Sequence, residues 1–141
     1  MAKKSGGDIR DILRNYLATS ALMTDPLKPN GSIYKGTKPL NSTKEDVVVN
    51  LLYQVHNGHL SEGSLNINTH VPNLTLTVNG VIDRSQPDYA RLKYLTGIVY
   101  SAIDTVFGLD YNFEIVGEGE DSDENNYTFS NLKVSFNSIN I

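Results

Sequence analysis

Two neighbouring segments in the middle of the chain constrain its fold more than any other feature. Residues 45–53 form a nearly continuous apolar run, and residues 63–72 alternate between apolar and polar side chains. A short apolar run is typical of a strand covered on both faces, and alternation is typical of a strand with one buried face. Asn57-Gly58 lies between the two segments and favours a tight turn. The sequence therefore predicts an antiparallel hairpin of strands 46–54 and 64–71.

The second strand of this hairpin has two different faces, because side chains two residues apart lie on the same side of a strand. One face is made by Leu65, Ile67, Thr69 and Val71, and the other by Asn66, Asn68 and His70. We expect the first face to pack inward. The second face is either exposed to solvent or meets a neighbouring subunit.

Helical periodicity precedes and follows the hairpin. Asp8 is predicted to cap a first helix that ends near Ser20. The apolar face of this helix is Ile9, Ile12, Leu13, Tyr16 and Leu17. A second helix is predicted to begin near Ser85–Pro87 and to stop at Gly108. Its apolar stripe is Tyr89, Leu92, Leu95, Val99, Ile103 and Val106. Gly97 lowers the helix propensity of this segment, so we expect it to lie in close contact with the sheet.

The remaining segments add strands to the sheet. Residues 32–35 are predicted to form a short strand, whereas residues 74–80 fit either a strand or a loop. Two closing strands are predicted from the alternation that begins at Tyr111 and at Tyr127, the second with a bulge at Ser130-Asn131. The whole order predicts an α+β fold: a mixed, mainly antiparallel sheet of about four to five strands with two main helices packed on it. We expect a flexible N-terminal tail at residues 1–7 and a single domain at residues 8–141.

Charge is concentrated in one place. The chain of 141 residues has a formal net charge of −4 and no cysteine, so neither a disulfide nor a thiolate metal site can form. Six acids and no base occur within residues 114–124: Glu114, Glu118, Glu120, Asp121, Asp123 and Glu124. The rest of the chain is nearly neutral, and this balance does not favour nucleic-acid binding. We expect residues 117–126 to form an exposed acidic loop that joins the closing strands.

This loop contains one motif with possible chemistry. Asp121, Asp123 and Asn125 have the D-x-D-x-N spacing that begins a calcium-binding loop. The pattern then fails, because Asn126 stands where glycine is required and Leu132 stands where glutamate is required. We interpret the segment as a solvated hairpin tip. A weak cation site, a charged contact with a partner and a metal-dependent enzyme using these acids are the alternatives.

The rest of the chain offers little for catalysis. His56 and His59 lie on either side of a predicted turn with Glu62 nearby, but no third ligand for zinc is evident. There is no Gly-x-Ser-x-Gly elbow and no glycine-rich phosphate loop. The sequence predicts no catalytic, cofactor-binding or metal-binding residue, and we expect no enzymatic activity.

The order of elements resembles the tail terminator proteins of long-tailed bacteriophages, also called tail completion or minor tail proteins, and their relatives at the head–tail joint. The resemblance rests on residues 33–36 (IYKG), 45–50 (EDVVVN) and 63–72 (GSLNINTHVP), followed by a helix like residues 88–107 and a closing pair of strands. The resemblance covers residues 8–139. It lies in the order of the elements and in their pattern of apolar and polar residues, not in an invariant motif.

The resemblance implies a structural virion protein. Such proteins form a ring, commonly of six subunits, that caps the tail tube and offers a platform to the head connector. The expected partners are therefore further copies of the chain, a tail tube protein and head-connector or neck proteins. The expected location is the tail–neck region of the virion, after assembly in the host cytoplasm. Neither a membrane nor a specific nucleic-acid sequence is an expected partner.

Subunit or partner contacts are expected at two sets of residues. They are Asn66, Asn68 and His70 on the polar strand face, and Glu118, Glu120, Asp121, Asp123 and Glu124 in the acidic segment. Two alternatives stay open. The chain could be another phage neck protein, such as a head-closure protein, or a non-viral adaptor that holds a peptide or a subunit on the same sheet.

Overall fold

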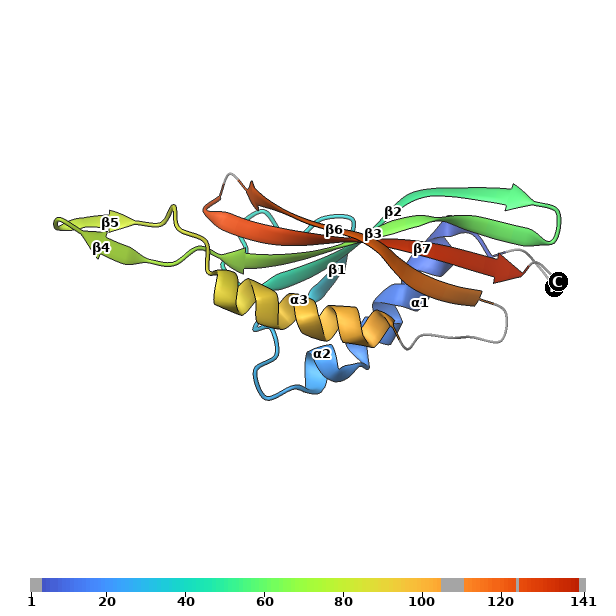
Figure 1. Ribbon diagram of the computed structural model, residues 1–141, viewed down its shortest axis with the longest axis horizontal. Coiled ribbons are helices and arrows are strands. Elements are labelled where there is room, and N and C mark those ends of the chain that lie inside the picture. The colour runs from blue at the N-terminus through green and yellow to red at the C-terminus, as the bar shows by residue number, and fades with distance from the viewer. Residues whose placement is uncertain (1–3, 105–110, 124, 140–141) are drawn as a thin grey trace.

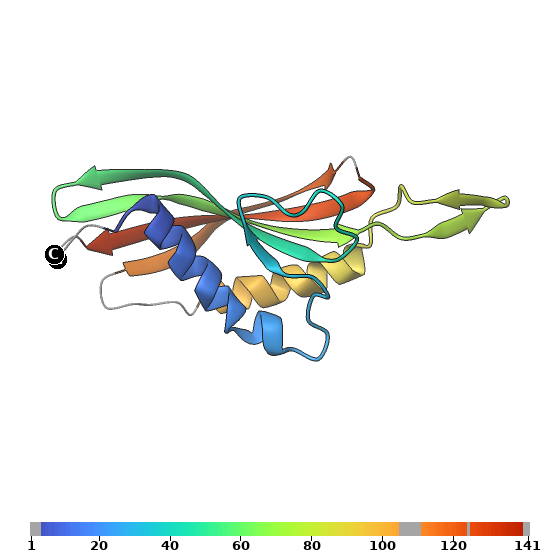
Figure 2. The same cartoon turned by 180° about the vertical axis from the view of Figure 1, so that it is seen from behind.

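A five-stranded sheet forms the centre of the protein, and the helices lie on one of its faces (Figures 1 and 2). The computed structural model describes residues 4–104, 111–123 and 125–139. The strands are β1 (Ile33–Lys35), β2 (Asp46–Asn57), β3 (Leu60–Pro72), β7 (Tyr127–Ile139) and β6 (Tyr111–Asp123), in that spatial order. β1 is parallel to β2, and the other neighbours are antiparallel. The predicted α+β fold with a mixed, mainly antiparallel sheet is confirmed.

Helix α1 (Gly6–Ala18) begins earlier than the sequence suggested. Its N-cap is Ser5 rather than Asp8. Ser5 Oγ accepts a hydrogen bond from the backbone N–H of Asp8 (3.1 Å), and Asp8 Oδ2 accepts one from the backbone N–H of Ser5 (2.7 Å). This reciprocal pair is a capping box, which satisfies two donors at once and so favours the earlier start. Residues 5–7, expected in the N-terminal tail, therefore cap and begin the helix.

The hydrophobic core lies between the helices and the sheet. α1 buries Ile9, Leu13 and Leu17, as its periodicity predicted, and the short helix α2 (Ala21–Thr24) buries Leu22. The sheet contributes the inward face of the central hairpin and of β7: Val47, Val49, Leu65, Ile67, Leu132, Val134 and Phe136. Every residue in that list is at most 1% exposed, so α1 is held chiefly by apolar burial.

Helix α3 (Tyr89–Ile103) crosses the same face of the sheet, with Asp88 as its N-cap. Leu92, Leu95, Val99 and Ile103 are buried as expected, but Tyr89 is 59% exposed. Val106 and Gly108, the predicted end of the stripe and the predicted stop, lie outside the described residues. Arg91 fixes the first turn, since its guanidinium binds both carboxylate oxygens of Glu45 at 2.6 and 2.8 Å.

The expected contact between Gly97 and the sheet is wrong. Gly97 is exposed, and a side chain there would meet no neighbouring atom within 4 Å. Its neighbour Thr96 faces the sheet instead, where its hydroxyl lies 2.7 Å from Ser130 Oγ in a buried hydrogen bond.

The predicted bulge at Ser130-Asn131 is wrong, and this hydrogen bond accounts for a serine at an inward position there. β7 pairs with β3 in unbroken register, so Ser130 occupies an ordinary inward position and Phe129 points to the opposite face. A polar residue at an inward position looked like a slip in the alternation. The irregularities lie instead in β2, between Leu51 and Tyr53, and in β6, between Ile115 and Gly117.

The segment expected as an acidic loop is mostly strand. β6 continues through Asp123 and pairs with β7 as far as Tyr127. Of the described residues, only Asn125 and Asn126 lie between the strands, in a turn. The prediction failed because a run of acids usually indicates solvated loop, whereas here alternate side chains leave opposite faces of a strand at the edge of the sheet.

Residues 74–80, which fitted either a strand or a loop, contribute to a second hairpin that projects from the body (Figures 1 and 2). β4 (Leu76–Val78) pairs with β5 (Val81–Asp83) in a separate two-stranded sheet. Asn79 and Gly80 make the turn with φ angles of 52° and 77°. Positive φ at both central residues is the conformation that Asn-Gly favours in two-residue hairpin turns.

Gly63 allows the closest backbone approach in the sheet, and we predict that Gly63→Ala destabilises the protein. A Cβ at this position would overlap the carbonyl oxygen of Tyr53 and lie 2.9 Å from Cε1 of Phe136. Overpacking of this kind costs about 1–3 kcal/mol, which urea unfolding would measure. Gly119→Ala is the matched control, because a Cβ there meets no atom within 4 Å. Equal stability of the two variants would contradict the close approach.

Candidate interaction surfaces

The sheet face opposite the helices is polar, and we call its central part the open face. It consists of Asn50, Asn66, Asn68, Asn131, Lys133 and Ser135, all of them at least partly exposed. The strand register places them side by side, with Asn66 between Asn50 and Lys133. Asn131 Nδ2 donates to Asn68 Oδ1 at 2.7 Å, so one amide pair crosses from β7 to β3. Asn66 and Asn68 thus share a face, as the alternation predicted.

His70 lies on the same side of β3 but is not open to a neighbour. Only 9% of the residue is exposed, because the loop of residues 36–45 covers this end of the face. The loop is fastened by Tyr127, whose hydroxyl donates to the backbone oxygens of Ser42 (2.9 Å) and Lys44 (3.0 Å). Lys38 Nζ lies 3.6 Å from the centroid of the Tyr127 ring. The expectation that His70 is free for contact with a neighbour is therefore wrong for the single chain.

The surroundings of His70 favour the neutral form of its imidazole by lowering its pKa. Burial lowers the pKa of His70, and the nearby Lys38 ammonium lowers it further, whereas Asp123 and Asp46 act in the opposite direction. The carboxylate of Asp123 is 3.9 Å from His70 Nδ1, which is too long for a hydrogen bond. The ring of Phe129 packs on His70 with centroids 5.0 Å apart. Desolvation therefore outweighs the attraction of the two carboxylates.

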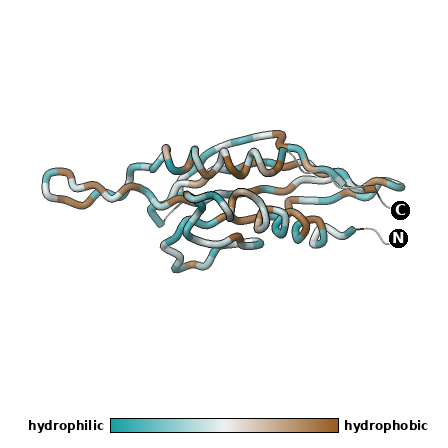
Figure 3. Tube along the Cα trace, turned by 90° about the horizontal axis from the view of Figure 1, so that it is seen from below, coloured by the Kyte–Doolittle hydropathy of each residue, from teal (hydrophilic) through white to brown (hydrophobic). Residues whose placement is uncertain are grey.

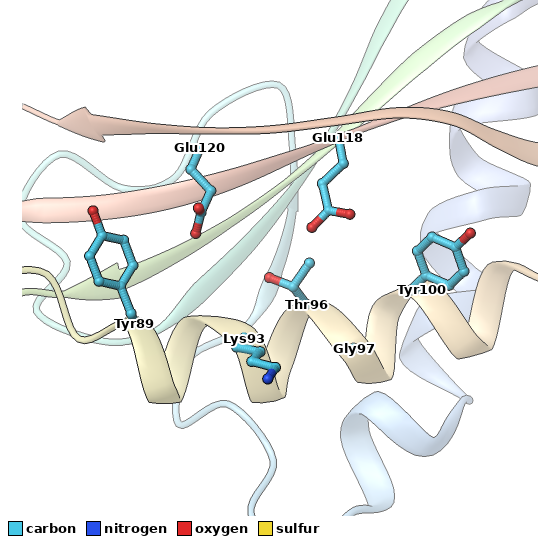
Figure 4. A pocket seen from close by; sticks show the side chains of 7 residues that line it. All are labelled: Tyr89, Lys93, Thr96, Gly97, Tyr100, Glu118 and Glu120. Atoms are coloured by element: carbon cyan, nitrogen blue, oxygen red, sulfur yellow. The ribbon is translucent and has the colours of Figure 1, made fainter.

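The five acidic interface candidates do not form one cluster. Glu118 and Glu120 face the helices and line a cleft of about 630 Å³ between β6 and α3. Figure 4 shows both carboxylates directed toward α3, with Tyr89 and Tyr100 at the two ends of the cleft and the amino group of Lys93 directed away from them. Asp121 and Asp123 face the opposite side, beside Phe129 and His70 respectively. Glu124 lies outside the described residues.

The separation of these acids onto two faces of β6 argues against the two metal-binding alternatives, a weak cation site and a metal-dependent enzyme. Asp121 and Asp123 are in an extended strand, where their carboxylates do not curl around one ion. Within the described part of the chain, no three histidine, aspartate or glutamate side chains come together as a metal site. His56 is engaged locally, since its Nδ1 lies 2.5 Å from Ser61 Oγ.

β6 is an edge strand whose features oppose pairing with another strand. Edge strands expose unpaired backbone groups, and proteins protect them with bulges and with inward-pointing charges. β6 has both, in the irregularity after Ile115 and in Glu118 and Glu120. The edge of β6 therefore offers side chains rather than an extended backbone ladder to its surroundings.

Sequence reasoning missed the two apolar ends of the molecule. We call residues 74–84 the arm and residues 52–61 the far end. The arm exposes Leu76, Val78, Val81 and Ile82, and the far end exposes Leu52, Tyr53, Val55 and Leu60. A signal was present, because Glu62 is the only Lys, Arg, Asp or Glu between Asp46 and Asp83. An absence of charge is also typical of strand core, so it does not by itself indicate an exposed surface.

No family model and no curated protein sequence matches this chain. None of the described helices is long and apolar enough to span a membrane.

The burial of His70 predicts a specific pH dependence of stability. Its pKa is lower in the folded state than in the unfolded state, so the unfolded state binds more protons below about pH 6.5. Stability should fall as the pH drops from 7 toward 5 and should stop responding to His70 below its folded pKa. His70→Gln should flatten this part of the profile, measured by urea unfolding at each pH. His59→Gln, the same change at an exposed position, should leave the slope unchanged, and equal slopes in all three proteins would contradict this role of His70.

Proposed function

We propose that this protein is a structural virion subunit, a phage tail terminator that assembles into a ring, caps the tail tube and joins it to the head connector. The proposal combines the family resemblance with one structural observation. That observation is the open face, a polar surface on the central strands that none of the described helices covers. Buried apolar residues hold the opposite side of the same strands, so the open face is presented on a rigid support.

The chemistry of the open face suits contact with another copy of the chain. An asparagine side chain both donates and accepts hydrogen bonds, so an amide-rich surface can bind polar groups on a different surface of a neighbouring copy without a charged partner. Asn68 already accepts from Asn131, and Lys133 adds a single cation at the edge of the group. Contacts of this kind fix the register and orientation of subunits, as a ring with identical neighbours requires.

The distribution of ionisable groups supports a structural role over an enzymatic one. A catalytic site needs a nucleophile or base within reach of an orienting group. The acids of β6 are divided between the two faces of the sheet, and His70 is covered by a loop. Glu118 and Glu120 remain available for a charged contact with a neighbouring ring.

The direct test is assembly with and without the tail tube protein, followed by native mass spectrometry and negative-stain electron microscopy. We expect a homo-oligomeric ring that binds the end of preformed tubes and stops their growth. A strict monomer at high concentration that leaves tube growth unchanged would count against the proposal. Binding to head-connector proteins without any effect on tubes would favour another neck protein, and binding only to proteins of the host cell would favour an adaptor.

A variant can test the open face itself. Asn66→Arg places a long cation at the centre of the open face, beside Lys133, so charge repulsion and bulk should weaken ring assembly by at least about tenfold. The unfolding free energy should change by less than about 0.5 kcal/mol, as for most surface substitutions. Asn15→Arg on the exposed side of α1 is the matched control. Normal rings from the Asn66 variant would show that subunits do not meet at the open face.

A further inference from the structure

The arm is an apolar element without cover from its own chain. Its five large apolar side chains are between 38% and 67% exposed: Leu74, Leu76, Val78, Val81 and Ile82. β4 and β5 pack chiefly on one another, with no substantial packing on the described helices or on the five-stranded sheet. An isolated two-stranded hairpin is only marginally stable in water. Exposed apolar groups on such an element indicate that another surface covers it.

The base of the arm is firmly closed, so the arm leaves the body at a defined place. The backbone N–H of Leu74 donates to the carbonyl oxygen of Gln86 (2.8 Å), and Asn73 Nδ2 donates to the carbonyl oxygen of Arg84 (3.0 Å). The backbone N–H of Asn73 also donates to the carbonyl oxygen of Asn126 (2.8 Å). These hydrogen bonds join the two segments at the base of the hairpin to each other and to the turn between β6 and β7.

Three of the arm's apolar residues share one face of the hairpin. Val78 and Val81 lie directly opposite each other, and Leu76 is two residues from Val78 on the same strand. All three therefore share one side of the hairpin with Asp83, which pairs with Leu76, while Thr77 and Ile82 share the other side. Between Leu74 and Ile82 there is no Lys, Arg, Asp or Glu.

A surface of matching chemistry lies at the opposite end of the long axis (Figure 1). The far end is the tip of the β2–β3 hairpin, beside the last residues of β7. Leu52, Tyr53, Val55, Leu60 and Ile139 are between 45% and 55% exposed there. Residues 52–61 also contain no Lys, Arg, Asp or Glu. Figure 3 shows apolar segments in the arm at one end of the tube and near the chain termini at the other.

We propose that the arm of one copy lies on the far end of the next copy. The contact joins two unlike surfaces at opposite ends of the molecule, so each copy offers one arm and one far end to its neighbours. Such a heterologous contact can repeat from copy to copy and closes into a ring when the rotation between neighbours permits. The occupant is a second copy because the apolar segments 74–82 and 52–61 both lack Lys, Arg, Asp and Glu. Both also expose β-branched, leucine or tyrosine side chains, and both occur once in every subunit. The inference rests on the proposed ring and adds a second contact between neighbouring copies to the one proposed at the open face.

The absence of cysteine makes a cross-linking test direct. One preparation carries Val81→Cys in the arm, and a second, distinguished by an affinity tag, carries Val55→Cys at the far end. Mixing the two under mild oxidation should give a disulfide-linked pair that contains one tagged and one untagged chain. Leu40→Cys, at an apolar residue that is 85% exposed in the loop covering His70, is the control and should link to neither. Efficient linkage of Val81→Cys only to itself, to the control or to the tail tube protein would overturn the proposal.

A substitution in the arm tests the energetic role of the contact. Val78→Thr with Val81→Thr keeps two β-branched residues of nearly the same shape, so the hairpin retains its strand propensity. The added hydroxyls would be placed in an apolar contact, and self-association should weaken by at least about tenfold, measured by analytical ultracentrifugation. Leu40→Ser should leave association unchanged. Thermal unfolding of the body should be the same in all three proteins.

The two readouts separate this inference from the proposed function. Rings that form normally from the double threonine variant, together with no cross-link between arm and far end, would overturn the arm contact and leave the tail terminator proposal standing. A cross-link between arm and far end without any effect on tail tubes would support the arm contact and overturn the terminator function.

Discussion

The structure depends on the two-sided pairing of β3. This strand is hydrogen-bonded along its length to β2 on one side and to β7 on the other. Its alternation sends Leu65, Ile67 and Val71 toward the helices and leaves Asn66 and Asn68 on the opposite side. Because burial of the apolar side chains fixes the register, a slip of one residue would place the asparagines in the core. The positions of α1 and α3 and the polarity of the open face follow from this single strand.

A few polar contacts then fix how the surrounding elements lie on the sheet. Arg91 binds Glu45 in a bidentate ion pair, which joins the start of α3 to the residue that precedes β2. The hydrogen bond raises the pKa of Arg91, so the guanidinium stays charged. Tyr127 holds the loop over His70 in a comparable way. Each contact joins residues far apart in sequence, and each restrains an element that apolar packing alone would leave free to shift.

Local sequence patterns predicted the helices and strands well. They predicted the tertiary contacts and the exposure of individual residues less well. The central hairpin, the buried face of α1 and most of the α3 stripe follow from periodicity, because burial of one face imposes period 2 or 3.6. The acidic segment was misassigned, since whether a carboxylate lies on a loop or on an edge strand depends on partners in β7. The hydrogen bond between Thr96 and Ser130 links residues of α3 and β7, so neither residue reveals it alone. Of the candidate interface, Asn66 and Asn68 lie where predicted, whereas the burial of His70 depends on a loop that the strand pattern does not contain.

The absence of Lys, Arg, Asp and Glu from residues 52–61 and 74–82 has a consequence for the conditions under which copies could associate. Salt screens attraction between charged surfaces but strengthens the burial of apolar ones when the ions are excluded from protein surfaces. A contact between the arm and the far end would draw on apolar burial, so it would persist in concentrated salt and weaken on cooling. A charged contact made with a partner through Glu118 and Glu120 would respond in the opposite sense to salt. The same chain thus carries two kinds of surface whose strengths can be separated by ionic strength and temperature alone.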